Sequence, residues 1–191
     1  MNYLTKIIIA LFIIFSSIST FCQYTIFDNN GMVDIKPTDN AFIVIETEGS
    51  SIELYNKVKM YVNQVMNNPE ASIIADEKGV FIKWRTYVPE IATFNAGINY
   101  EVNIKYNTSI SCKDNKIKVV VNIFDGEVDN GTRSWPLTYT RGGVSYYGIY
   151  KKNGIITNVG QNIKTNIETY FNDMLKSIEL SLSNEPKKDD W

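Results

Sequence analysis

The chain has no histidine and only two cysteines, Cys22 and Cys112, among its 191 residues. Histidine is the commonest transition-metal ligand in proteins and the commonest general base near neutral pH. A zinc cluster built from several Cys and His side chains is therefore excluded, as is a nucleophile activated by histidine. We expect the protein to have no metal and no other cofactor.

The sequence also lacks a large excess of charge of either sign. Its 19 basic and 21 acidic residues give a net charge of -2, and residues 1–22 contribute only Lys6 to this count. No stretch is strongly basic, so there is no electrostatic basis for binding nucleic acid or an anionic membrane surface. The acidic, glycine-containing stretch 125–131 lacks the alternating ligand order of a helix-loop-helix calcium site, and we interpret it as a solvated turn.

The N-terminal segment, residues 1–22, has the order of a secretory signal. Lys6 precedes an apolar run at 7–15 that is too short for a transmembrane helix, and small or polar residues follow it. We expect a protein exported to the periplasm or cell envelope, without an integral membrane span once the signal is removed. Lipidation of Cys22 is the alternative, which we do not favour because the residues before Cys22 depart from a lipobox.

The clearest pattern in the chain is the alternation at residues 98–112, where even-numbered positions are apolar or weakly polar and odd-numbered positions are polar. A period of two is typical of a strand with one buried face. A second alternating stretch at 117–123 follows a four-residue loop, so the two strands should pair as a hairpin. We expect four even-numbered residues to be buried against helices: Tyr100, Val102, Ile104 and Tyr106.

Shorter strands are predicted at 41–47, 71–75 and 80–88, where β-branched and aromatic residues gather. The last two should form a hairpin. Pro89 should end the second of them, because proline has no N–H group to donate to a ladder. Residues 90–97 would then connect to the next strand.

Two amphipathic helices are predicted. The first begins at Ser50, which forms a capping box with Glu53, and apolar residues continue at three- and four-residue spacing to Val65. The second, residues 162–182, has the same spacing over about five turns. We expect both helices to pack on the sheet.

The stretch 125–161 is rich in glycine and aromatic residues and is the hardest part of the chain to interpret. A connection of this length is unusual in a compact domain and often has a function. We expect it to contain one or two irregular strands, for instance at 145–150 and 155–159.

These elements predict a single α+β domain at 41–182, with 125–161 as an insertion. A turn-rich lead-in at 23–40 precedes the domain, and a polar tail at 183–191 follows it. The expected architecture is a curved antiparallel sheet of about five strands with two main helices on one face, in the order β-α-β-β-β-β-α.

Residues 49–88 carry a resemblance to a known family. They read SSIELYNKVKMYV and then IIADEKGVFIKW, in the order strand, helix, hairpin. This resembles a domain family of unknown function that is common in secreted Bacteroidetes proteins and has a fold similar to the TATA-box-binding protein. The resemblance covers roughly 41–125, and the helix at 162–182 would complete the unit. It implies a curved antiparallel sheet with helices on its convex side, and it implies no activity.

The face of the sheet away from the helices is the first candidate binding surface. A minor-groove saddle needs basic residues and apolar wedges on this face, whereas this sequence places Asn, Glu and Lys there, so DNA binding is not expected. Mixed charges, amides and aromatic rings suit adaptable recognition instead. The candidate ligand-binding residues, from this face and from the 125–161 stretch, are Lys83, Arg85, Glu101, Asn103, Lys105, Trp135, Tyr139, Tyr146 and Tyr147.

Three functions compete. The first is a non-enzymatic envelope binding or accessory module that binds an envelope protein, peptide or glycan and is a monomer or weak oligomer. The second is a hydrolase using paired carboxylates, such as Glu101 with Glu90 or Asp125, which would need two environments that separate their pKa values. The third is a purely structural envelope subunit. We favour the first, because nothing in the sequence shows carboxylates converging.

Overall fold

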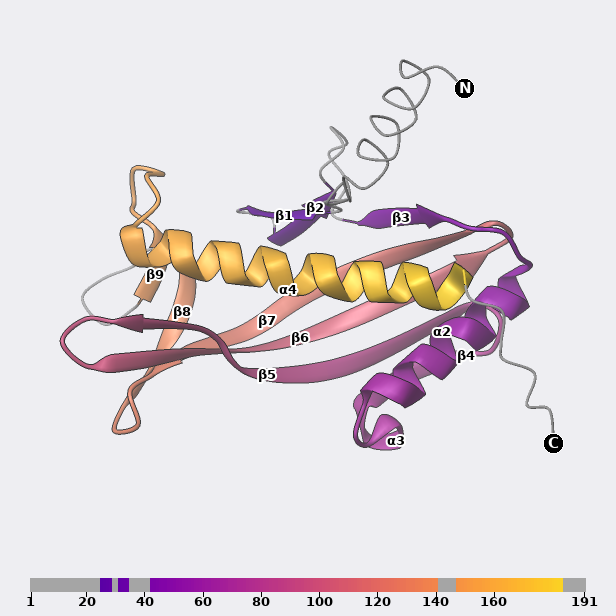
Figure 1. Cartoon of the computed structure of the whole chain (residues 1–191), viewed down its shortest axis with the longest axis horizontal. Coiled ribbons are helices and arrows are strands. Elements are labelled where there is room, and N and C mark those ends of the chain that lie inside the picture. The colour runs from indigo at the N-terminus through magenta and orange to yellow at the C-terminus, as the bar shows by residue number, and fades with distance from the viewer. Residues whose placement is uncertain (1–24, 29–30, 35–41, 141–146, 184–191) are drawn as a thin grey trace, which may run out of the picture.

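The computed structural model of the chain describes residues 25–28, 31–34, 42–140 and 147–183. It has one seven-stranded sheet with the helices on one face, and the longest helix follows almost the whole length of the sheet (Figure 1). The strands of this sheet are β3 (Ile43–Glu46), β4 (Ile73–Glu77), β5 (Phe81–Asn95), β6 (Asn99–Lys113), β7 (Lys116–Asp129), β8 (Ser134–Thr140) and β9 (Tyr147–Tyr150). The helices are α2 (Ser51–Val65), α3 (Pro69–Ser72) and α4 (Asn158–Ser183).

The sheet is organised around a meander of its three longest strands, β5, β6 and β7. The strand order is β4-β5-β6-β7-β8-β9, and β3 pairs with the beginning of β7. All described pairings are antiparallel except that of β8 with β9. A separate hairpin of β1 (Thr25–Asp28) and β2 (Gly31–Asp34) contacts α4 and β7.

The predicted alternation of β6 is confirmed. Val102, Ile104 and Tyr106 are at most 1% exposed and face α2 and α4, while Tyr100 is half-buried near the beginning of the strand. The hydroxyl of Tyr106 lies 2.9 Å from that of Tyr170 on α4. The core therefore lies between one face of the sheet and the two helices.

Two β-bulges lie on opposite sides of β6 at nearly the same level. In β5 the pairing passes from Val88 opposite Ile104 to Ala92 opposite Val102, which leaves extra residues in β5. In β7 an extra residue, Phe124, lies between the partners of Lys105 and Tyr106. Extra residues of this kind increase local twist and bend the strand that carries them.

The prediction that Pro89 ends its strand is wrong, because β5 continues to Asn95. Pro89 lies inside the bulge, where its missing N–H does not break the ladder. Glu90 beside it has a φ of 52°, a left-handed conformation that the bulge accommodates. Residues 91–95 therefore extend the sheet instead of forming a connection.

Both predicted helices are present. The capping box of α2 is confirmed, since the Ser50 hydroxyl accepts from the Glu53 amide at 3.4 Å and the Glu53 carboxylate accepts from the Ser50 amide at 2.8 Å. The helix α4 begins at Asn158, four residues earlier than predicted. The Lys57 ammonium of α2 donates to the Leu182 carbonyl at the end of α4 and so joins the two helices.

The α+β class and the two main helices on one face are confirmed, but the sheet has seven strands where about five were expected. Residues 125–129 belong to β7 and not to a turn, and β8 was not predicted. The strand expected within 145–150 is β9. The strand expected at 155–159 is absent; this segment contributes one isolated bridge at Ile156 and the first residues of α4.

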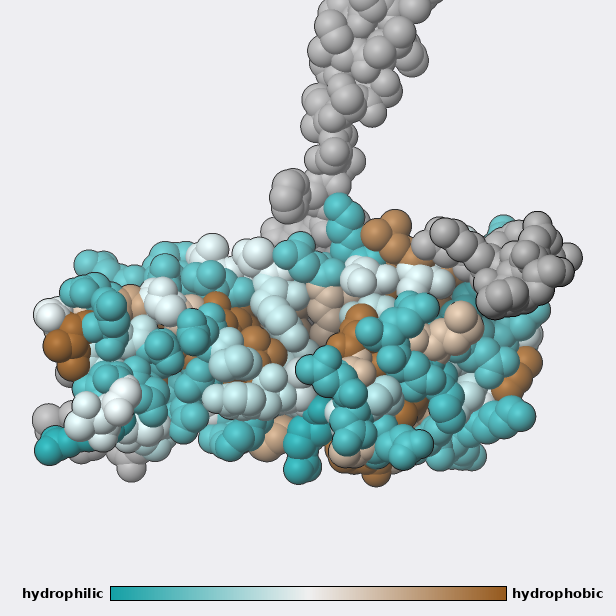
Figure 2. Space-filling view, turned by 60° about the horizontal axis from the view of Figure 1, so that its bottom comes forward, coloured by the Kyte–Doolittle hydropathy of each residue, from teal (hydrophilic) through white to brown (hydrophobic). Residues whose placement is uncertain are grey.

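The exposed large hydrophobic side chains come from several elements, among them α2, β4, β5, β7 and α4. In the view of Figure 2, hydrophobic residues lie in small groups among hydrophilic ones. None of the helices in the described part of the chain is both long and apolar enough to cross a membrane.

The first turn of α4 packs directly on the backbone of β9. A Cβ atom added to Gly160 would overlap the carbonyl oxygen of Ile149. The Thr157 amide donates to this same carbonyl at 3.0 Å, and the Gly160 amide donates to the Thr157 hydroxyl at 2.8 Å. Gly160 is therefore needed for its lack of a side chain, since any other residue would push α4 away from β9.

We predict that Gly160→Ala destabilises the protein by about 1–3 kcal/mol, the usual cost of forcing extra atoms into a packed site. Urea unfolding measures this as a lower midpoint. Gln161→Ala is the matched control, because Gln161 is the next residue on α4 and is exposed. A Gly160→Ala midpoint equal to that of the control would show that α4 does not contact β9 in this way.

Candidate functional site

The face of the sheet opposite α2 and α4 is open in the described part of the chain. Odd-numbered residues of β6 and their partners on β5 and β7 point to this face. The described residues of 125–161 extend the sheet through β8 and β9, and β9 contacts α4. These strands therefore do not cover the open face, and Arg85, Lys105 and Asp125 are exposed on it.

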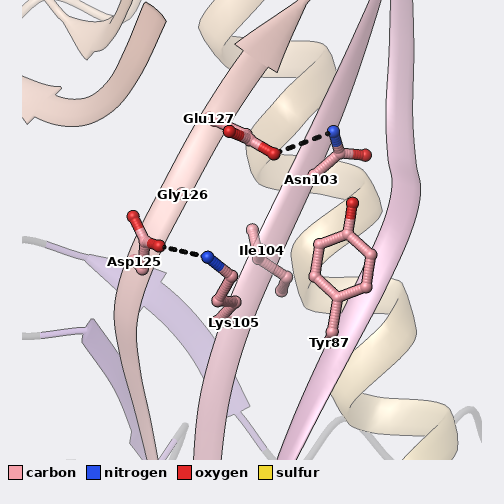
Figure 3. A pocket seen from close by; sticks show the side chains of 7 residues that line it. All are labelled: Tyr87, Asn103, Ile104, Lys105, Asp125, Gly126 and Glu127. Carbon is pink, nitrogen blue, oxygen red and sulfur yellow. Dashed lines mark hydrogen bonds and ion pairs between the residues drawn. The ribbon is translucent and has the colours of Figure 1, made fainter. Parts of the chain in front are cut away.

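A shallow hollow, too shallow to enclose a water molecule, lies on this face between the two bulges (Figure 3). Lys105 and Asp125 form an ion pair across it, with 2.8 Å between Nζ and Oδ2, and both side chains are about half exposed. This hydrogen bond raises the pKa of Lys105. The Tyr87 ring stands beside the pair and is 51% exposed. The hollow is lined by Tyr87, Asn103, Ile104, Lys105, Asp125, Gly126 and Glu127.

Asn103 is buried, unlike the other candidates on this face. Its Oδ1 accepts from the backbone amide of Glu90 at 2.9 Å, and its Nδ2 donates to Glu127 at 3.5 Å. Because Glu90 lies in the β5 bulge, the Asn103 side chain replaces the strand partner that the bulge removes. The amide oxygen of Asn103 is thus engaged in holding the bulge.

Four of the nine candidate residues lie on the open face and are exposed or partly exposed to solvent: Lys83, Arg85, Glu101 and Lys105. The Arg85 guanidinium lies 5.1 Å from the centre of the Phe124 ring and donates through Nε to Asn107 at 3.3 Å. Such contacts hold an arginine in one orientation. The bulge residue Phe124 is thereby placed on the open face as well.

Trp135 and Tyr147 lie away from this face, in an aromatic cluster with Phe94 and Tyr100. Phe94 and Tyr100 are stacked with ring centres 5.0 Å apart, and Trp135 and Tyr147 lie 6.0 and 5.5 Å from Tyr100. The register places the cluster on the helix-facing side near the beginning of β6. The rings pack this end of the sheet. The Tyr139 side chain and Tyr146 fall outside the described residues.

The three carboxylates considered for hydrolysis have different neighbours. Glu101 lies opposite Asp129 and Thr93, Asp125 is paired with Lys105, and Glu90 lies in the bulge. Across residues 25–28, 31–34, 42–140 and 147–183, no group of three Cys, Asp or Glu side chains is placed to hold a metal ion.

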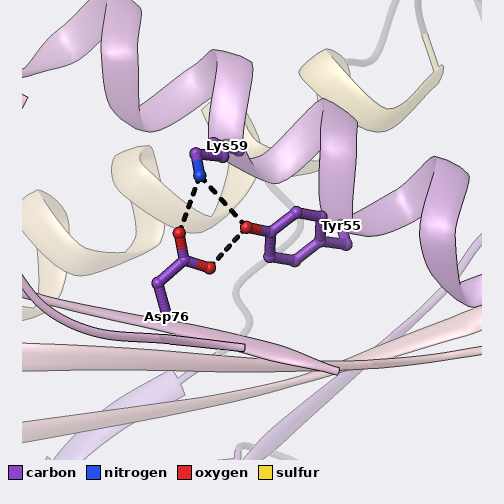
Figure 4. A network of polar contacts seen from close by, with 3 residues as sticks. All are labelled: Tyr55, Lys59 and Asp76. Atoms are coloured by element: carbon purple, nitrogen blue, oxygen red, sulfur yellow. Dashed lines mark hydrogen bonds and ion pairs between the residues drawn. The ribbon is translucent and has the colours of Figure 1, made fainter. Parts of the chain in front are cut away.

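A second polar cluster joins α2 to β4 (Figure 4). Lys59 Nζ lies 2.7 Å from Asp76 Oδ2 and 3.2 Å from the Tyr55 hydroxyl, which itself donates to Asp76. Lys59 and Tyr55 lower the pKa of Asp76 through these hydrogen bonds, and burial raises the pKa of Tyr55. Since every polar atom of the cluster is turned toward another, we interpret it as a clamp between the helix and the edge strand.

Five residues that line the hollow were not among the predicted ligand-binding candidates, and three of the five are aromatic or charged: Tyr87, Asp125 and Glu127. Tyr87 is on the same side of β5 as Lys83 and Arg85, so the alternation alone could have identified it as a candidate. Asp125 and Glu127 follow the extra residue Phe124, which reverses the parity of β7. Their positions could not be assigned from the alternation at 117–123.

We predict that Asn103→Ala lowers the free energy of unfolding by about 1–3 kcal/mol, because it leaves the Glu90 amide without its partner. Asn122→Ala is the control, since Asn122 is an exposed amide on the same face. Denaturant unfolding should separate the two variants. Equal stability would mean that Asn103 does not hold the bulge.

The aromatic cluster makes a separate prediction about pH. Burial and the hydrogen bond with Tyr100 raise the pKa of Tyr147 to about 12. The neutral phenol is thus favoured in the folded state, so its contribution to stability is complete below the ordinary tyrosine pKa of about 10 and is lost as the pH rises toward 12. Tyr147→Phe should reduce the fall in unfolding free energy over this range, measured by denaturant titration at several pH values. An unchanged fall would contradict the shift.

Comparison with known proteins shows a likeness in fold alone. No protein-family model matches the chain, and no curated protein matches it in sequence. Among solved structures, a TBP-like protein from Parabacteroides distasonis has a TM-score of 0.45 at 16% identity, over 75% of this chain and 96% of that one. A DUF4468 family protein from Bacteroides ovatus has a TM-score of 0.51 at 11% identity, over 80% of this chain and 92% of that one. The chain thus shares its fold with a Bacteroides protein of a domain-of-unknown-function family, which confirms the resemblance in fold predicted from the sequence.

Proposed function

We propose that this protein is a non-enzymatic binding or accessory module of the cell envelope, and that it binds an envelope protein, peptide or glycan on its open sheet face. The observation that carries the proposal is the group of exposed side chains of different kinds around the hollow: Tyr87, Lys105 and Asp125. Export to the envelope is supported by the signal-like order of residues 1–22.

The side chains around the hollow are those that suit recognition. Tyr87 is 51% and Phe124 44% exposed, although both are large aromatic residues. A sheet face that serves only as a solvated surface carries polar residues, so exposed aromatic rings on it favour a binding role. The neighbouring Arg85, Lys105 and Asp125 add groups that can donate and accept hydrogen bonds at the rim of such a contact.

Contacts with neighbouring side chains orient these groups. Arg85 is oriented by Phe124 and Asn107, and Lys105 by Asp125, so little side-chain entropy remains to be lost on binding. This preorganisation supports binding rather than catalysis, because each charged group near the hollow already has a partner of its own.

Photo-crosslinking tests the proposal. A benzophenone amino acid at Tyr87 or Phe124, in cells of the native host, should give covalent adducts with a partner. Met60 on α2 and Leu180 on α4 are matched control positions, because they are 48% and 54% exposed on the helices. Adducts from all four positions, or from the control positions alone, would contradict binding at the open face.

A second variant tests the charged groups. Arg85→Ala combined with Lys105→Ala removes both cations next to the hollow and keeps the aromatic rings. We expect the adduct formed at Phe124 to fall by about tenfold or more, the effect of losing roughly 1.4 kcal/mol of binding free energy. An unchanged yield would show that these two cations take no part in binding.

A further inference from the structure

The open face carries opposite charge at its two ends. The end of the face that runs from Lys105 to the turn between β5 and β6 carries four carboxylates and one cation. The other end, which begins at Arg85, carries five cations and two carboxylates. The acidic end holds Glu101, Asp125, Glu127 and Asp129 with Lys105, and the basic end holds Lys83, Arg85, Lys113, Lys116 and Lys118 with Glu46 and Glu77.

The two ends are evenly spaced about the middle of β6. Asn107 lies opposite Asn122, and this pair marks the middle. Glu127 lies at the level of Asn103, four residues before Asn107 on β6, and Lys118 lies at the level of Ser111, four residues after it. Glu101 and Lys113 lie six residues before and after Asn107 on β6 itself. If the face is turned end for end about Asn107, its acidic groups therefore come to lie where its basic groups were, and the reverse.

We propose that the open face binds the open face of a second copy of this chain, with the strands of the two sheets antiparallel. This inference rests on the proposed function, because it names the partner of the same surface. A two-fold axis that lies between the sheets and crosses β6 at Asn107 would set Glu127 of each copy against Lys118 of the other. It would also set Glu101 against Lys113, so every contact occurs twice, as two-fold symmetry requires.

Near its axis such an interface would hold Lys105, Asp125 and Arg85 of each copy. Lys105 and Asp125 neutralise each other within one copy. Arg85 lies at the level of the axis, so the Arg85 side chains of the two copies would lie opposite each other, each held by its own Phe124 ring and Asn107 amide. The complementary charges therefore lie at the two ends, where they determine the direction in which the sheets meet.

The face is large enough for a stable dimer. The strands β5, β6 and β7 have 15, 15 and 14 residues, or about 50 Å each at roughly 3.3 Å per residue. With about 4.8 Å between strands, these three cover about 700 Å². The edges of β3 and β4 add to this area at the basic end. A standard interface buries about 800 Å² on each partner.

Sedimentation equilibrium of the purified protein tests the inference. The wild type should form dimers that weaken as salt rises from about 0.05 M to about 0.5 M, because exposed ion pairs are screened. Lys118→Glu and Glu127→Lys should each raise the dimer dissociation constant at least tenfold. The double variant Lys118→Glu with Glu127→Lys should restore dimerisation, because both contacts then reverse their sign together.

Lys176→Glu is the control, since it makes the same change of charge at an exposed position on α4. Wild-type protein that stays monomeric up to a concentration of about 1 mM, where only very weak complexes remain dissociated, would overturn the inference. A double variant no tighter than the single ones would overturn it too.

The crosslinking experiment separates this inference from the proposed function. Adducts at Tyr87 or Phe124 that contain two copies of this chain support both. Adducts with a different protein or with a glycan, from wild-type protein that is monomeric, support the proposed function and overturn the dimer. Absence of any adduct together with a monomeric protein overturns both.

Discussion

Burial of one side of β6 beneath α2 and α4 is the constraint on which the rest of this structure depends. The largest fully buried side chains, Trp84, Tyr106 and Phe171, come from β5, β6 and α4 and meet in this layer. Two elements of different period can share a core only if each presents a continuous apolar stripe. The alternation of β6 and the three-four spacing of α4 meet this condition, and both were visible in the sequence.

One covered face implies one uncovered face, since an antiparallel sheet can have one side in contact with water. The helices use up the apolar side chains, so the opposite face carries the polar members of the same strands. The candidate functional residues therefore lie among the side chains that the core does not bury. The hollow arises where the two bulges interrupt the regular ladder on both sides of β6, because a bulged strand bends and re-aims its side chains.

The fold class, the meander and the two helices could be predicted because each follows from a local pattern. The end of β5 could not, since a proline usually terminates a strand and only the pairing with β6 shows that a bulge accommodates Pro89. The face to which the β7 residues after Phe124 point could not be predicted either, because the extra residue is visible only in the pairing with β6. The parallel pairing of β8 with β9 depends on contacts between distant segments, which no local period records.

The same distinction applies to the candidate site. Alternation alone placed Lys83, Arg85, Glu101 and Lys105 on one face, because parity is a local property. It could not show that Asn103 supports a bulge, because that role needs Glu90 from another strand. The aromatic residues of 125–161 looked equally available in the sequence, yet Trp135 and Tyr147 pack against Tyr100.

Charge on the open face selects a direction of binding more than it supplies affinity. Two copies with parallel strands would bring acidic end to acidic end and basic end to basic end, and repulsion between like charges would oppose that arrangement. Antiparallel copies would meet with opposite charges at both ends. Because each exposed ion pair contributes little net free energy, in the proposed dimer most of the attraction comes from the exposed rings of Tyr87 and Phe124 near the middle, and the ion pairs add the part that salt screens. The β7 bulge that exposes Phe124 thus connects the shape of the sheet to the binding that we propose for it.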